Sequence, residues 1–203
     1  FNKFRVYYKT GKWLVAISIV YWLGTQSNIF VLGYLYNVEL VGIFSALLVP
    51  IGMIRIIQTA SESYLLPVLS KHYHHNSNNI KKHVFKESSI FYLIIFIAYL
   101  LIFIFDKYFL SLFYQNKFDE YLDIFSYLLI YGFLQSIVFQ ISIYYKITDK
   151  TKDLFLINKI VVYISIPVSI VAIYFYSLTG LSFALIFISF MNVFLLLKQL
   201  KNV

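Results

Sequence analysis

Long runs without a single charged residue alternate with short polar segments along this chain. A membrane-spanning helix needs about 20 predominantly apolar residues, whereas a strand of a membrane barrel needs about ten in strict alternation. The runs do not alternate, so their length and pattern predict membrane-spanning helices and not a barrel. The uncharged runs are Trp13–Val38, Leu40–Ile54, Ser88–Phe105, Ile124–Tyr145 and Ile160–Leu197.

Two of the runs need adjustment before the spans can be counted. The last is too long for one crossing, and Ser177-Leu-Thr-Gly180 places a turn in its middle. The second stays apolar beyond Arg55 and Glu62 as far as Pro67. We therefore predict an all-α polytopic membrane protein in which residues 1–203 form one six-helix lobe, with spans at 13–36, 40–67, 88–106, 124–146, 155–177 and 180–197.

The composition agrees with this prediction. Hydrophobic residues make up 61% of the chain and charged residues 13%, against roughly 45–50% and about 25% in soluble domains. The mean hydropathy of +0.77 excludes an ordinary soluble globule. The chain has no cysteine, which excludes disulfides, thiolate metal sites and thiol catalysis. The net charge of +8 does not indicate a nucleic-acid partner, because the charges lie between the apolar runs.

The distribution of Lys and Arg predicts the orientation. Short cationic loops stay on the cytoplasmic side of a membrane, and the predicted outer side holds only Lys107 and Lys117. We expect a multi-pass protein of the cell (inner or plasma) membrane with both ends of the chain in the cytoplasm. The predicted cytoplasmic set is Lys3, Arg5, Lys9, Lys12, Lys71, Lys81, Lys82, Lys86, Lys146, Lys150, Lys152, Lys159, Lys198 and Lys201.

One group of polar residues lies deep inside the second predicted span. Arg55, Gln58, Thr59 and Glu62 are spaced i, i+3, i+4 and i+7, so they share a helix face. An arginine at this depth costs roughly 2.5–3.5 kcal/mol on insertion scales, so this face should contact the bundle interior or water. Arg55 would bind an anion and Glu62 a proton or cation. The alternative is a structural Arg55–Glu62 ion pair, because seven residues span about 10.5 Å of helix.

Other polar and small residues in the spans have simpler interpretations. Gln26, Asn28 and Gln135 complete the candidate substrate cavity, although an interhelical hydrogen bond explains any single amide, Gln140 included. Small residues four apart predict close helix packing at two places, Gly42 with Ala46 and Gly180 with Ala184. His72, His74 and His75 lack the ligand spacing of a metal site, so we expect no bound metal.

The order of these features resembles the second half of polysaccharide or O-antigen flippases of the multidrug/oligosaccharidyl-lipid/polysaccharide exporter superfamily. The resemblance covers nearly the whole chain, and each motif alone is weak. It rests on the runs Ser27-Asn-Ile-Phe-Val-Leu-Gly-Tyr-Leu-Tyr-Asn-Val-Glu-Leu-Val-Gly-Ile-Phe-Ser-Ala46, Tyr64-Leu-Leu-Pro-Val-Leu-Ser70, Leu112-Phe-Tyr, Lys146-Ile-Thr-Asp-Lys and Leu178-Thr-Gly-Leu-Ser-Phe-Ala184.

The resemblance implies a transporter and not an enzyme. Two six-helix lobes would enclose a cavity, with this chain as the C-terminal lobe beside the N-terminal lobe of the same protein. By alternating access they would move a polyprenyl-diphosphate-linked oligosaccharide from the cytoplasmic to the outer leaflet of the lipid bilayer. No cofactor is expected, and the coupling ion could be H⁺ or Na⁺. Asn28 stands where such flippases often carry an aspartate, which makes Glu62 the better candidate for a coupling carboxylate.

Several other functions stay open from the sequence. Within the same superfamily they are a lipid II flippase and a multidrug exporter, of which the exporter would favour a cavity with carboxylates and few cations. A subunit of a membrane glycan polymerase or ligase is also conceivable, but such enzymes usually carry a large outer loop with catalytic Arg or His. An accessory membrane subunit is the last alternative, because one lobe cannot enclose a cavity by itself.

Overall fold

The computed structural model describes residues 2–75, 80–115 and 117–201, and every element within them is helical. Five helices are long and apolar enough to cross a membrane, which confirms the predicted all-α polytopic membrane fold. The elements are α1 (Asn2–Leu35), α2 (Val38–His75), α3 (Ile80–Ile104), α4 (Asp106–Tyr114), the 3₁₀ turn η1 (Asp119–Tyr121), α5 (Leu122–Ile147) and α6 (Thr151–Lys201).

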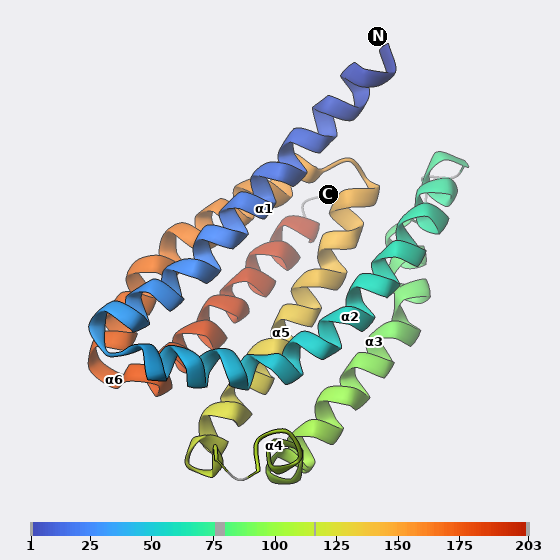
Figure 1. Cartoon of the computed structure of the whole chain (residues 1–203). Coiled ribbons are helices and arrows are strands. Elements are labelled where there is room, and N and C mark those ends of the chain that lie inside the picture. Colours follow the sequence, from blue (N-terminus) through green and yellow to red (C-terminus); the bar gives the residue numbers. More distant parts are fainter. Residues whose placement is uncertain (1, 76–79, 116, 202–203) are drawn as a thin grey trace.

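The predicted count of six spans is not reproduced as six separate helices. Helix α6 contains 51 residues, and Ser177 interrupts it with non-helical backbone angles of φ 52° and ψ −132°. Figure 1 shows that α6 reverses its direction there, so a first arm runs beside α1 and a second arm returns to the C-terminus. The two arms are thus two helices that meet at a kink at Ser177, inside the segment 177–180 where the sequence predicts a turn.

The helix ends fall into two groups at opposite ends of the bundle (Figure 1). Both termini lie at one end, together with the connection between α5 and α6. The junction of α1 with α2, the short helix α4 and the bend in α6 lie at the other end. Helix α2 bends between these ends, and it contains Pro50, whose ring disfavours a straight helix.

Two clusters of buried apolar side chains stabilise the bundle, and α5 contributes to both. The cluster nearer the termini includes Val138, Ile141 and Tyr145 of α5. The cluster at the opposite end includes Phe125 and Leu128 of the same helix. Polar residues in the middle of α5 thus lie between the two apolar clusters.

The two pairs of small residues have different environments. A Cβ atom on Gly42 would meet nothing within 4 Å, so the predicted close helix contact is absent there, and the backbone oxygen of Ala46 instead accepts a hydrogen bond from Tyr114. A Cβ atom on Gly180 would lie 2.0 Å from the backbone oxygen of Ala172. Ala184 is buried as well. The close approach at Gly180 is between the two arms of α6. The four-residue spacing between Gly180 and Ala184 predicts close helix packing but not this partner.

We predict that Gly180→Ala lowers the free energy of unfolding by at least about 1–3 kcal/mol, because the clashing atom belongs to rigid backbone. Thermal unfolding in detergent micelles would measure the effect. Gly52→Ala is the matched control, since a Cβ there meets nothing within 4 Å, and it should raise stability by up to about 1 kcal/mol. Equal stability of the two variants would contradict the close approach.

Candidate functional site

The four polar residues predicted to share one face of α2 have different environments. Gln58 is buried against the neighbouring helices with 5% of its surface exposed. Arg55 and Thr59 are exposed on this chain, and the side chain of Glu62 is 18% exposed. The shared face is therefore divided: α5 packs against the Gln58 edge of α2 and leaves the Arg55 edge uncovered.

One aromatic ring of α1 lies against Arg55. Its guanidinium carbon lies 5.2 Å from the centroid of the Tyr21 ring, a cation–π arrangement that is stronger where water is excluded. Tyr131 of α5 lies close enough to Tyr21 and Arg55 to interact electrostatically with both. We call Arg55, Tyr21 and Tyr131 the arginine–tyrosine cluster. Among the described residues, no carboxylate forms an ion pair with Arg55.

A second polar group joins α2, α3 and α5 next to this cluster. The amide nitrogen of Gln58 donates a hydrogen bond to the Ser136 hydroxyl, and Ser136 donates to the backbone oxygen of Gly132 over 2.9 Å. The Tyr99 hydroxyl from α3 reaches the backbone of α5 at Gly132 and interacts with Ser136. We call Gln58, Ser136 and Tyr99 the polar junction. It lies between the two apolar clusters and holds three helices at one level.

Gly132 provides the space for this junction. A Cβ atom on Gly132 would lie 2.7 Å from the Tyr99 hydroxyl oxygen and 2.7 Å from a methyl carbon of Ile51. Any larger residue would therefore push α2 or α3 away from α5. Because interhelical hydrogen bonds require close approach of the backbones, the glycine is a precondition for the contact between Gln58 and Ser136.

Glu62 pairs with Lys146, which the sequence analysis places at the cytoplasmic end of the predicted span 124–146. The Lys146 ammonium of α5 donates a hydrogen bond to the Glu62 carboxylate, and both side chains are mostly shielded, at 25% and 18% exposure. The proposed Arg55–Glu62 ion pair is absent, because Glu62 already has its partner. Lys146 also approaches the Phe139 ring to 5.7 Å.

The three remaining amides of the predicted cavity have different surroundings. Gln135 donates to Ser189 of the second α6 arm over 2.9 Å, so it belongs to a different interface. Asn28 is buried in α1, and Gln26 is partly exposed there. Gln140 is buried, and among the described residues its amide nitrogen and oxygen have no partner.

The histidines contribute no recognisable metal site within the described part of the chain. The rings of His72 and His83 lie 6.1 Å apart in a stacked arrangement between α2 and α3. No group of three or more His, Asp or Glu side chains that could hold a metal ion occurs in the residues described. The side chains of His74 and His75 and residues 76–79 lie outside them.

Comparison with known proteins now identifies the family. Residues 1–123 match the family described as polysaccharide biosynthesis protein, which covers more than half of the chain. The chain belongs to this polysaccharide biosynthesis family. No curated protein and no solved structure matches it.

The matched region of this polysaccharide biosynthesis protein includes α1 to α3, and with them Arg55, Tyr21, Gln58 and Tyr99. Sequence reasoning identified Arg55 and Gln58 but missed the tyrosines and Ser136. Those residues lie inside apolar runs that are already rich in Tyr and Ser, so nothing in their spacing distinguished them. Lys146 could have been found, because it is the last-turn cation of a predicted span.

We predict that Glu62 and Lys146 are energetically coupled. Glu62→Gln and Lys146→Met should each lower the free energy of unfolding by about 1–3 kcal/mol, since each leaves a shielded charge without its partner. The double variant should lose less than the sum, with a coupling of about 0.5–3 kcal/mol. Unfolding in mixed micelles would measure the cycle. As a control, Glu87→Gln at an exposed position should alter the free energy of unfolding by less than about 0.5 kcal/mol. If the effects of Glu62→Gln and Lys146→Met simply add in the double variant, the ion pair is refuted.

Proposed function

We propose that this polysaccharide biosynthesis protein is a flippase that moves a lipid-diphosphate-linked oligosaccharide from the cytoplasmic to the outer leaflet by alternating access. In this proposal the protein is a transporter and not an enzyme, and it uses no cofactor. The family assignment supports the role in polysaccharide synthesis. The membrane-spanning helices support a substrate that is attached to a lipid.

The position of Arg55 carries the proposal. Arg55 lies seventeen residues after Val38 and eighteen before Tyr73, the ends of the candidate span. An ionisable residue at that depth is by default a functional residue. Its guanidinium offers a planar fork of donors that suits a phosphate, and it does not lose its proton at physiological pH. Tyr21 holds this group at the exposed edge of α2.

The uncovered surface of α1 and α2 supports a second lobe as the partner. Only 6% of the α1 span is buried inside this chain, against half of the α5 span. An arginine cannot face lipid tails without a large cost, so the exposed edge at Arg55 needs protein or water beside it. We propose that the N-terminal lobe of the same protein closes the cavity there.

We predict that Arg55→Ala reduces glycan export about tenfold or more while the protein still inserts into the membrane. Hydrogen bonds to charged groups contribute about 1.5–3 kcal/mol, and 1.4 kcal/mol corresponds to a factor of ten. Export can be measured as polysaccharide at the surface of complemented cells, with protein in the membrane fraction as the reference. Arg55→Lys should recover only part of the activity, because an ammonium lacks the fork.

Lys82→Ala removes the same charge from an exposed position outside the site and should leave export unchanged. Normal export by Arg55→Ala would refute the role of the cavity. Export of a drug or of lipid II instead of the oligosaccharide carrier would favour one of the other transporters. A glycan that reaches the surface but stays short would favour a polymerase subunit.

The orientation of the chain can be tested separately because the chain has no cysteine of its own. We predict that a membrane-impermeant thiol reagent labels Lys117→Cys from outside intact cells and does not label Lys152→Cys until the membrane is opened. The cationic segments should stay in the cytoplasm, and both positions are exposed on the chain. Labelling of Lys152→Cys in intact cells would reverse the proposed orientation.

A further inference from the structure

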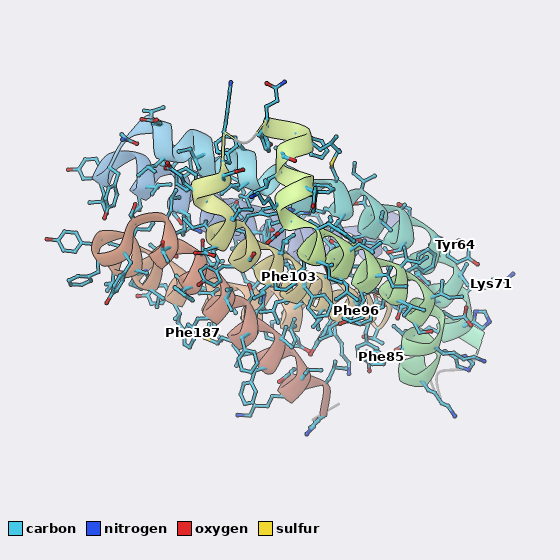
Figure 2. All side chains as sticks on the ribbon, turned by 90° about the horizontal axis from the view of Figure 1, so that it is seen from below. Tyr64, Lys71, Phe85, Phe96, Phe103 and Phe187 are labelled. Carbon is cyan, nitrogen blue, oxygen red and sulfur yellow. The ribbon has the colours of Figure 1, made fainter. Side chains whose placement is uncertain are left out.

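An apolar groove lies between α3 and α5 beside the polar junction. Its walls come from Phe96, Tyr99 and Phe103 on α3 and from Leu129, Ile130 and Phe133 on α5, and its volume is about 150 Å³. Figure 2 shows Phe96 and Phe103 spaced along α3. The exposed surface of the lining residues is almost entirely carbon, so the groove suits a hydrocarbon and offers nothing to a sugar.

Aromatic rings give the groove a fixed shape. The Phe133 ring lies 5.7 Å from that of Phe96 and 6.1 Å from those of Tyr92 and Tyr99, measured between centroids. Tilted and edge-on ring pairs of this kind contribute about 0.5–1.5 kcal/mol beyond the area that they bury. These contacts favour one arrangement of the rings, and that arrangement defines the shape that an occupant of the groove has to match.

The size of the groove matches one short, branched hydrocarbon unit. An enclosed cavity of about 150 Å³ lined by Leu, Ile and Phe stays dry and binds benzene, which has six carbon atoms, whereas this groove is open along one side. An isoprene unit has five carbons, one of them a branching methyl. The groove therefore accommodates one unit of a polyprenyl chain, while the rest of the chain stays in the bilayer.

Tyr99 connects the groove to the polar junction. Its ring forms part of the groove wall, and its hydroxyl oxygen lies against the backbone of α5 at Gly132. Gly132 is one turn from Ser136, which accepts the hydrogen bond of Gln58, and Gln58 is one turn from Arg55 on α2. A phospholipid keeps its phosphate at the membrane surface, whereas a lipid in transit carries its phosphates through the middle of the span. An apolar groove at the level of a mid-span cation therefore fits the transported lipid better than a resident phospholipid.

We propose that the groove between α3 and α5 binds an isoprenoid unit of the lipid carrier. This inference rests on the proposed function, because it assigns a site to the tail of the same substrate whose phosphates Arg55 would bind. It adds a determinant of substrate choice that is separate from the arginine: the groove recognises the tail by shape, and Arg55 recognises the charge.

The test uses a polyprenol that carries a photoreactive diazirine on one isoprene unit, with the protein in phosphatidylcholine nanodiscs. Leu100→Trp fills the groove from α3, since Leu100 also lines it. Photolabelling of the α3 and α5 peptides should fall about tenfold in this variant. The probe loses its contacts with the groove walls, and a loss of about 1.4 kcal/mol in binding free energy corresponds to a factor of ten. Leu101→Trp is the matched control, because Leu101 is exposed but does not line the groove.

Ile130→Trp fills the groove from α5 and should reproduce the loss, which guards against misfolding of the first variant. An excess of unlabelled polyprenol should compete, and an equal amount of phosphatidylglycerol should not. Equal labelling of Leu100→Trp and Leu101→Trp would overturn the proposal. Equal competition by phosphatidylglycerol would also overturn it, because the groove would then be a general site for acyl chains.

The uncharged probe separates this inference from the proposed function. Arg55→Ala should leave polyprenol labelling unchanged, because the probe carries no phosphate for the guanidinium to bind. Loss of export in Arg55→Ala without any labelling of the groove would retain the flippase and reject the groove. Labelling of the groove with normal export by Arg55→Ala would retain the tail site and reject the role of the arginine.

Discussion

An arginine in the middle of a membrane span must find an environment other than hydrocarbon, and the arrangement around α2 meets this constraint. Insertion scales assign roughly 2.5–3.5 kcal/mol to a central arginine, and one neighbouring Leu or Ile returns only about 0.3–0.6. In this chain the guanidinium lies against the ring of Tyr21, and Tyr131 of α5 lies near both. The arginine is thus held by aromatic rings that leave its charge uncompensated.

The same requirement determines how α2 packs on α5. Gln58 lies one helical turn from Arg55 and reaches Ser136, so the polar junction fixes the register between the two helices. The junction exists only because Gly132 lets Tyr99 and Ile51 approach the backbone of α5. Apolar clusters on either side exclude water from it. If the register between the two helices shifted, the polar groups of the junction would be left without partners in an apolar interior. Because that is costly, the hydrogen bond specifies one register more strictly than apolar packing does.

The sequence predicts those features that depend on the composition of a single segment. The apolar runs gave the fold class, and the polar positions in the second run located Arg55. Features that depend on a distant partner were not predictable. Helical spacing places Arg55 and Gln58 on one face of α2. It does not predict that α5 covers Gln58 and leaves Arg55 exposed.

The small residues and the ion pair illustrate the same difference. Gly42 and Gly180 have equivalent spacings to an alanine, yet only Gly180 meets a backbone atom, because the bend at Ser177 brings Ala172 beside it. Glu62 lies seven residues from Arg55 but pairs with Lys146, 84 residues away. Periodicity describes a single helix, whereas each of these contacts joins two helical segments.

The ion pair between Glu62 and Lys146 also changes the electrostatics of the site. Because Lys146 neutralises Glu62 while no described carboxylate neutralises Arg55, the exposed edge of α2 keeps a net positive charge. A low-dielectric surface strengthens that field, so this edge of α2 attracts anions and repels cations.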